Sequence, residues 1–405
     1  MKVAVGSSNH PEAEVAAQIA VASAHKTITQ PDLVLAFCSN SVNPESYYNA
    51  IRAQLGGMVP IVGGSAIGVI TNEFLGYQGA TSALAFIQCD TIAFQLAHAN
   101  GLFKDPEQTG KALAHSLKDV ADASLLFVLY DSIKYAATSS TPALLNPSSL
   151  LLNGLNHSIR QSLPIVGAGL LGDQQFKAVT HFNGHAVSTQ SASALLFSGA
   201  IKPYITVMHG CTPLSLKQYT ITDIFGQFLY KLDGQPVVDV IDQAYGSPLW
   251  RLQSPVRKIC LGRALASVNL ASDEASYTNR LISGILPDND GIILFEPDFK
   301  VGDKVQLMQR APKQIVQSAR SQTADLLQQI EQAGDKPMFA LYINCGGRAA
   351  AFEDSDQEEA AEVQHLLNHA GIPLLGFYCG VEIAPNVDGK SQGLDWSGVL
   401  VIFSQ

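Results

Sequence analysis

The chain contains the stretch Met338-Phe339-Ala340-Leu341-Tyr342-Ile343-Asn344-Cys345-Gly346-Gly347-Arg348, in which a short apolar run ends in polar groups. The apolar part is typical of a buried β-strand. Adjacent glycines let backbone N–H groups approach a ligand closely, and an arginine fork beside them suits a carboxylate or a phosphate. We therefore predict a cluster of ligand-binding residues at the end of this strand: Asn344, Cys345, Gly346, Gly347 and Arg348.

A second apolar run of the same kind, residues 372–383, follows an acidic stretch that is typical of a helix. Two strand ends that carry polar groups can converge on one pocket. In such a pocket the Arg348 segment would bind an anionic group and Glu382 a cationic one. Phe377 and Tyr378 would cover the apolar part of the ligand.

Length and composition favour a large, well-buried α/β protein. With 405 residues the chain exceeds what one hydrophobic core usually supports, which predicts two domains. A hydrophobic content of 47% with 15% charged residues excludes a disordered chain. The net charge of -10 argues against nucleic acid or an anionic membrane as a partner.

The cellular compartment is indicated by what the sequence lacks. The N-terminal residues form no signal peptide, and no uncharged apolar run is long enough to span a membrane. Six cysteines are scattered along the chain, which suits reduced thiols in the cytoplasm better than a disulfide framework. No CxxC pair or histidine cluster offers a metal site, and we expect no cofactor.

A repeated order of elements organises the chain. A buried strand, a helix, a Pro-aliphatic-aliphatic-Gly strand, a polar segment and a closing strand follow one another three times. The motif prolines, Pro60, Pro164 and Pro373, are 104 and 209 residues apart, which suggests internal duplication. The interval of two periods leaves room for a degenerate fourth copy around residues 280–295.

The expected fold is therefore α/β, with two related modules of mixed β-sheets covered by helices. We place the modules at residues 1–200 and 201–405, with the boundary near Gly199 to Pro203. Short returns between strands favour mixed rather than purely parallel sheets. Within the second module, an Asp-Gly turn at Asp233 predicts a hairpin, and residues 311–333 predict a long helix.

Three motifs, one for nucleotide binding, one for catalysis and one for calcium binding, do not fit their context. Gly167 to Gly172 matches the dinucleotide pattern GxGxxG but is followed by a predicted hairpin rather than a helix. The glycines around Ser65 are spaced one residue too far apart for a nucleophile elbow. The acidic residues between Glu353 and Glu362 lack the order of a calcium-binding loop and favour a helix start.

A thiol enzyme remains an open alternative. Cys345 or Cys379 could be a nucleophile, with His365 or His369 as its base, in a hydrolase or transferase. A cysteine at a strand end is more often a small buried hydrophobic residue.

Several segments of the sequence resemble the FIST family (F-box and intracellular signal transduction). The segments that resemble its C-terminal module are residues 344–348, 376–378 and 382–385. Residues 32–39 and 60–68 resemble its N-terminal module. The resemblance implies a sensory input module for small ligands such as amino acids, and it adds Gly63 and Ser65 to the expected ligand-binding residues.

The leading hypothesis is thus a stand-alone, cytoplasmic, non-enzymatic signal-transduction protein that binds a small ligand between strand-end loops. The ligand would be amino-acid-like and would carry a carboxylate. The second hypothesis is the thiol enzyme. The third is a scaffold that acts only through a signalling partner protein, for example as a homodimer.

Overall fold

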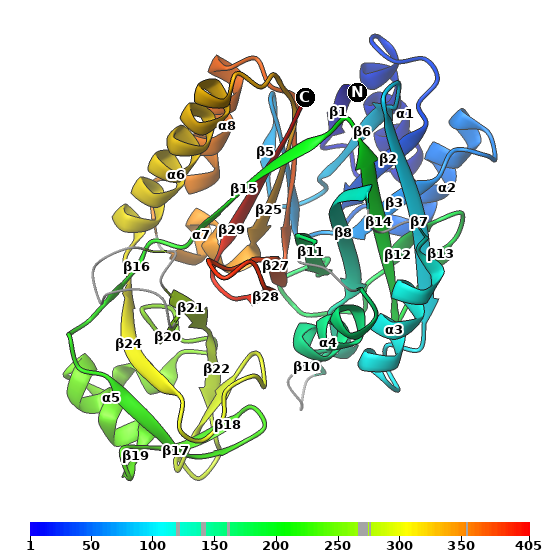
Figure 1. Ribbon diagram of the computed structural model, residues 1–405. Coiled ribbons are helices and arrows are strands. Elements are labelled where there is room, and N and C mark those ends of the chain that lie inside the picture. The colour runs from blue at the N-terminus through cyan, green and yellow to red at the C-terminus, as the bar shows by residue number, and fades with distance from the viewer. Residues whose placement is uncertain (119–121, 139–142, 160–162, 266–273, 275–276, 354) are drawn as a thin grey trace.

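The computed structural model describes the chain except residues 119–121, 139–142, 160–162, 266–273, 275–276 and 354. It confirms a mixed α/β fold in which helices cover mixed sheets (Figure 1). Three six-stranded sheets form the main body. A nine-stranded sheet forms a separate lobe, at the lower left of Figure 1.

The first sheet has the order β1-β6-β2-β3-β12-β13, and only β2 and β3 run parallel. Helices α1 and α2 pack on its outer face. Asn43 accepts a hydrogen bond from Ser46 N and caps α2. The elements are β1 (Lys2–Ser8), α1 (Ala13–His25), β2 (Leu33–Cys38), α2 (Pro44–Leu55), β3 (Ile61–Ser65), β6 (Ser82–Gln88), β12 (His181–Gly184) and β13 (Val187–Ser188).

The second sheet has the order β7-β14-β8-β11-β27-β28, with β8 and β11 parallel. Helices α3 and α4 cover it. Its elements are β7 (Ile92–Asn100), α3 (Pro106–Ser116), β8 (Ala123–Asp131), α4 (Ser148–Ser158), β11 (Ile165–Leu170), β14 (Ser191–Gly199), β27 (Val381–Pro385) and β28 (Ser391–Leu394). A short hairpin, β9 (Ile133–Tyr135) with β10 (Leu144–Leu145), lies beside it in the sequence.

The third sheet has the order β15-β29-β25-β26-β4-β5, with β25 and β26 parallel. The long helix predicted over residues 311–333 is present as α6, which begins at Pro312 and ends at a left-handed Gly334. The elements are β4 (Gly68–Thr71), β5 (Leu75–Gly76), β15 (Lys202–Met208), α6 (Pro312–Ala333), β25 (Pro337–Cys345), η4 (Gly346–Arg348), α7 (Ala350–Glu353), α8 (Glu359–His369), β26 (Leu374–Cys379) and β29 (Gly398–Ser404).

The strands of the fourth sheet come from the described residues between 211 and 310, and every strand pair that these residues form is antiparallel. Residues 282–294, part of the interval considered for a fourth copy, form the antiparallel pair β22–β23. In the described part of the chain, this interval therefore does not repeat the order of the other sheets. The elements are β16 (Cys211–Pro213), β17 (Tyr219–Phe225), β18 (Phe228–Leu232), β19 (Gln235–Pro236), α5 (Val237–Tyr245), η2 (Pro248–Leu252), β20 (Ile259–Ala264), β21 (Tyr277–Arg280), β22 (Ile282–Ile285), β23 (Ile292–Leu294) and β24 (Lys304–Arg310).

The three main sheets exchange hairpins in a ring. The hairpin β12–β13 completes the first sheet, β27–β28 completes the second, and β4–β5 completes the third. The predicted boundary near residue 200 falls between β14 and β15, but hydrogen-bonded strands cross it in both directions. The two modules are therefore not separate sheet systems.

The motif glycines have a common packing reason. Gly63, Gly167 and Gly376 each pair with a residue on the neighbouring parallel strand. A Cβ on any of the three would collide with the carbonyl oxygen of that paired residue. The spacing of these glycines in the sequence therefore marks the close contact of the parallel strand pair in each sheet.

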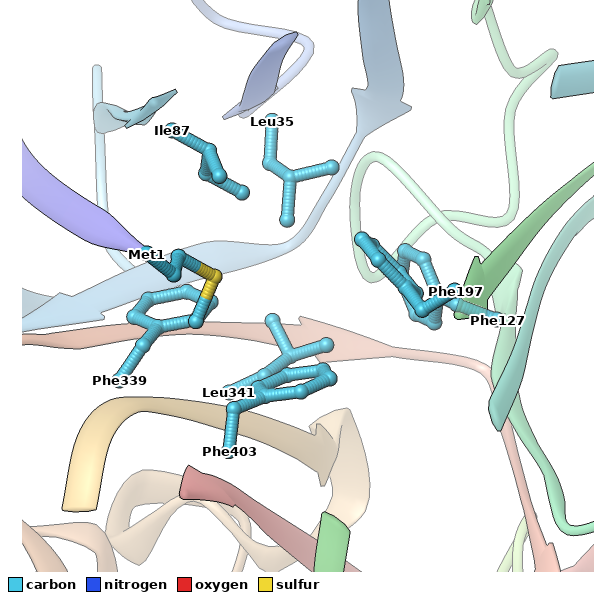
Figure 2. Close-up of a pocket in the computed structure, with 8 residues that line it drawn as sticks. All are labelled: Met1, Leu35, Ile87, Phe127, Phe197, Phe339, Leu341 and Phe403. Carbon is cyan, nitrogen blue, oxygen red and sulfur yellow. The ribbon is translucent and has the colours of Figure 1, made fainter. Parts of the chain in front are cut away.

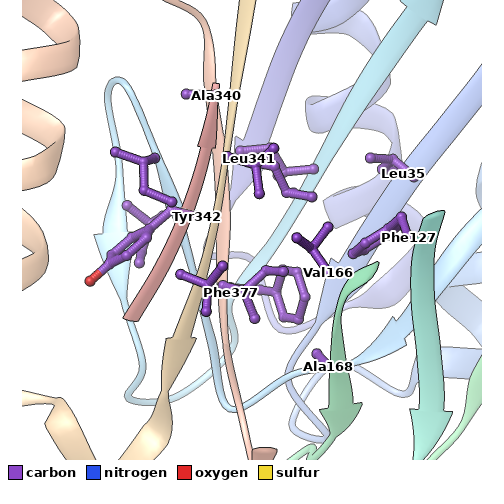
Figure 3. Packing of buried hydrophobic residues seen from close by; sticks show 14 of the residues in the cluster. Leu35, Phe127, Val166, Ala168, Ala340, Leu341, Tyr342 and Phe377 are labelled. Carbon is purple, nitrogen blue, oxygen red and sulfur yellow. The ribbon is translucent and has the colours of Figure 1, made fainter. Parts of the chain in front are cut away.

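The inner faces of the three sheets share one apolar core. Leu35, Phe127 and Leu341 come from β2, β8 and β25, and they lie in one cluster (Figure 3). The ring of Phe377 stacks on Phe37 with centroids 3.8 Å apart. Packing between sheets, rather than within one module, therefore buries the strands that the sequence predicts.

A small void remains at one end of this core (Figure 2). Its volume is about 10 Å³, close to the least space that holds one water molecule, and its lining is wholly apolar. It is therefore a packing defect rather than a ligand site. Its lining residues are Met1, Leu35, Ile87, Phe127, Phe197, Phe339, Leu341 and Phe403.

Leu341→Ala tests the shared core. Leu341 is 1% exposed, so truncation should lower the free energy of unfolding by about 2–5 kcal/mol, because it enlarges the existing void. Urea denaturation measures this loss. The matched control is Leu216→Ala, since Leu216 is 81% exposed and its truncation should change stability by less than about 0.5 kcal/mol. Equal effects of the two changes would contradict the shared core.

Candidate functional site

A polar cleft of about 510 Å³ opens at the carboxyl ends of the parallel strands. Its size lies within the usual range of ligand pockets, roughly 300–1,000 Å³. It joins loops from all three main sheets to one arginine of the nine-stranded lobe. The lining residues are Ser39, Ser41, Ile67, Tyr77, Gln78, Gly79, Gly172, Asp173, Gln174, Gln175, Arg257, Ala351 and Phe352.

The loop after β2 holds the loop after β11. The backbone N–H of Asn40 donates to the Gly172 carbonyl at 3.0 Å, and Asn40 Nδ2 donates to Asp173 Oδ2 at 2.8 Å. Asp173 Oδ1 also accepts the backbone N–H groups of Gln175 and Lys177. These bonds fix the Asp173 carboxylate beside the cleft.

Tyr77 connects the cleft to the buried residues behind it. Its ring meets the ring of Tyr378 edge-on, with centroids 5.3 Å apart, and its hydroxyl accepts the Ala351 N–H at 3.3 Å. Tyr378 in turn donates to Glu358 Oε1 at 2.9 Å. Burial raises the pKa of Glu358, and the Ala350 N–H opposes that rise.

Arg348 does not line the cleft and is only 1% exposed. Its guanidinium pairs with Glu359 at 3.1 Å, and its Nε donates to Asn344 Oδ1 at the same distance. Burial favours the neutral form of Arg348, but the Glu359 carboxylate raises the pKa of Arg348 above its ordinary value. The charge of Arg348 is thus balanced inside the protein, and a direct ligand role for it stays a prediction.

The glycines before Arg348 serve close packing. A Cβ on Gly346 would collide with Ile67, and one on Gly347 would collide with the ring of Trp396. Ile67 lines the cleft, so Gly346 lies one side chain behind it. The predicted amide site and the open cleft are therefore adjacent but not identical.

The other predicted site residues are also buried. Glu382 accepts hydrogen bonds from Cys379 Sγ at 3.3 Å and Ser397 N at 3.2 Å, and burial raises its pKa well above the usual range. Ser65 Oγ accepts the Thr180 N–H at 3.0 Å and, like Gly63, is enclosed in β3. Phe377 lies in the shared core. Their ligand roles stay predictions as well.

The two candidate nucleophiles are not activated. Cys345 and Cys379 are both buried, and burial raises the pKa of each thiol well above its usual range. The nearby Glu382 carboxylate raises both values further. A thiol in this environment is protonated near neutral pH, whereas thiol catalysis requires the thiolate.

Sequence reasoning found the buried layer of this region but missed most of the cleft. Ser41, Gln78 and Gln175 lie in exposed loops and carry no motif. Arg257 comes from the nine-stranded lobe, far along the chain from the other lining residues. Three lining residues lie in segments that the sequence analysis singled out: Ser39 and Ile67 in the segments that resemble the FIST N-terminal module, and Gly172 at the end of the rejected dinucleotide pattern. A Cβ at Gly172 would collide with Asn40.

Comparison with known protein families gives two matches along the chain. A FIST N domain matches residues 32–235 and a FIST C domain matches residues 239–385. The chain therefore belongs to the FIST family, whose domains are associated with signal transduction and sensory ligand binding. No curated protein matches the sequence.

Solved structures resemble the chain only distantly. A chorismatase has 7% identity and a TM-score of 0.34, with 94% of each chain covered. A cyanuric acid hydrolase from A. caulinodans has 10% identity and a TM-score of 0.35, with 99% of this chain and 98% of that chain covered. At these scores neither likeness bears on ligand or activity.

The described residues contain no helix long and apolar enough to cross a membrane. Nor do these same residues bring together three or more histidine, cysteine or acidic side chains in a way that could hold a metal ion.

Arg348→Met tests whether Arg348 is chiefly structural. The change leaves the buried Glu359 without its partner, which should lower the free energy of unfolding by about 3–5 kcal/mol. Combining it with Glu359→Gln should restore most of the loss, because both charges are then gone. Arg320→Met is the control, since the Arg320–Glu362 pair has an arginine that is 60% exposed. Chemical denaturation measures the free energy of unfolding of the parent, the two single variants and the double variant. A double variant no more stable than Arg348→Met would count against a self-contained pair.

Asp395→Asn should change how stability depends on pH. Asp395 is 2% exposed, and burial raises its pKa from 3.8 to about 7. Between these two pH values the folded protein keeps a proton that the unfolded chain releases. The contribution of Asp395 to the free energy of unfolding is therefore full below pH 3.8 and is lost as pH rises to about 7. The asparagine variant lacks this loss, and its stability relative to the parent should rise by up to about 4 kcal/mol between pH 4 and pH 8. Urea titrations at several pH values measure the difference, and parallel pH profiles would refute the assignment.

Proposed function

We propose that this FIST protein is a sensor that binds a small amino-acid-like ligand in the polar cleft. The observation that carries the proposal is the lining itself. One guanidinium, one carboxylate, several hydroxyl and amide groups and a few apolar side chains surround a ligand-sized space. A zwitterion with a small side chain offers complementary groups to each of them.

Opposite charges lie on different parts of the cleft. Arg257 brings a guanidinium from the nine-stranded lobe, and a fork of this kind suits a carboxylate. Asp173 is held by Asn40 on the opposite loop and supplies negative charge for an ammonium group. An amino acid carries both charges a few atoms apart.

Apolar side chains complete the lining. Ile67, Tyr77 and Phe352 belong to the cleft and can contact the carbon atoms of a ligand. Tyr77 also hydrogen-bonds to α7 and touches Tyr378, so it packs against the buried layer that holds Tyr378 and the other residues predicted to bind the ligand. In this proposal that layer shapes the cleft from behind.

The remaining elements of the hypothesis are part of the same proposal. A sensor needs an output, and we propose that a signalling partner protein receives it in the cytoplasm, with a homodimer as one form of the assembly. A thiol-dependent hydrolase or transferase has less support, because both candidate thiols are buried and burial raises the pKa of each.

Arg257→Ala tests the proposed site. The parent protein should be stabilised by at least one of the twenty amino acids in a thermal-shift screen, because a ligand of the folded state raises its apparent stability. Calorimetric titration should then show an affinity loss of about tenfold or more in Arg257→Ala, since a charge-assisted hydrogen bond contributes roughly 1.5–3 kcal/mol.

Arg251→Ala is the matched control, because Arg251 lies in the same lobe and pairs with Asp242 away from the cleft. It should bind like the parent. If no amino acid shifts the parent, or if both arginine variants bind equally well, the proposed ligand site is wrong.

A further inference from the structure

Arg310 links the two walls of the cleft although it does not line it. It is the last residue of β24 and is 2% exposed. Its Nη2 pairs with Glu353 of α7 at 2.5 Å, and its Nη1 donates to the carbonyl of Arg257 at 2.6 Å. One buried cation therefore joins α7 on the core side to Arg257 on the lobe side.

The short helix α7 faces the cleft on one side and Arg310 on the other. Ala351 and Phe352 line the cleft, and the Ala351 N–H donates to the hydroxyl of Tyr77. The next residue, Glu353, is directed to Arg310, and its side chain is 7% exposed. A group that displaces the wall at Phe352 therefore acts on the Glu353–Arg310 pair next to it.

Movement of Arg310 would reach two larger elements. Its guanidinium stacks on the ring of Trp396, 3.6 Å from the ring centroid. Ala311, directly after it, is the N-cap residue of the 22-residue helix α6 on the outer face of the third sheet. The nine-stranded lobe, through β24, and helix α6 thus meet at this one residue.

We propose that Arg310, held by Glu353 and Trp396, positions the two walls of the cleft and transmits occupancy of the cleft to β24 and α6. This inference rests on the proposed function only for the identity of the natural ligand. The coupling itself depends on contacts within the chain, and a covalent occupant of the cleft can test it separately.

The fluorescence of Trp396 gives the readout. The chain has two tryptophans, so Trp250→Phe leaves Trp396 alone. Cys89→Ser removes the one cysteine that is not buried, and Ser41→Cys then places a reactive thiol in the cleft. N-cyclohexylmaleimide attached at this thiol occupies part of the cleft and does not absorb where tryptophan does.

The adduct at Ser41→Cys should shift the emission of Trp396 beyond the scatter between replicate samples. The same adduct at Ser116→Cys, on the exposed end of α3, should leave the emission unchanged. Glu353→Gln should abolish the shift because it removes the charge that holds Arg310, and Glu362→Gln, in the exposed pair with Arg320, should preserve it.

Should Glu353→Gln fail to fold, Arg310→Lys keeps the charge but loses the planar stack on Trp396, and it should weaken the shift. No shift with the Ser41→Cys adduct, or an equal shift in Glu353→Gln, would overturn the coupling.

Titration of the Trp250→Phe protein with each of the twenty amino acids separates the two proposals. Thermal stabilisation without a change in Trp396 emission would refute the coupling alone. A shift with the adduct while no amino acid binds would support the coupling and refute the proposed ligand.

Discussion

The edges of the three main sheets impose the constraint on which this structure depends. A sheet edge presents unpaired backbone N–H and C=O groups, and burying them unpaired is costly. Each sheet solves this with a hairpin from another part of the chain: β12–β13 on β3, β27 on β11 and β4 on β26. Because the exchange is a ring, no sheet is complete without the next.

That ring also places the candidate site. The hairpins β4–β5 and β27–β28 begin just beyond the carboxyl ends of β3 and β26, and a bridge between Ala66 and Leu171 adds the end of β11, so these ends lie together around one region. Ile67 donates its N–H to the Tyr378 carbonyl, and Gly380 donates to Gly169, which ties three sheets at one point. The loops that continue from these strands form the cleft, and the shared apolar core lies behind it.

Charge burial explains why the most distinctive motif lies beside the cleft instead of lining it. Arg348 and Glu359 are both at most 1% exposed. A buried ion pair of this kind is stable only when further hydrogen bonds satisfy the polar atoms of its two side chains. Tyr342 and Asn344 do so by donating to Glu359. The glycines at 346 and 347 leave room for Ile67 and Trp396 to close over the pair. A guanidinium after two glycines is thus compatible with a ligand site and with a sealed interior, and sequence alone does not distinguish them.

Local pattern was enough to predict the mixed α/β fold, the long helix over residues 311–333 and the strands that contain Gly63, Gly167 and Gly376, because strand periodicity and helix starts act over short distances in the chain. The FIST family was indicated by the resemblance of short motifs, and the matches over residues 32–235 and 239–385 confirm it. The exchange of hairpins, the antiparallel lobe of residues 211–310 and the cleft were decided only by the tertiary structure. Their contacts join residues far apart in the chain, such as Asn40 with Asp173 and Arg257 with Arg310. The local sequence of a loop does not specify which distant residues it contacts in the folded protein. The burial of Arg348 also depends on the tertiary structure. Its ion pair with Glu359 of α8 balances the charge, and only this pair lets an arginine lie in the interior.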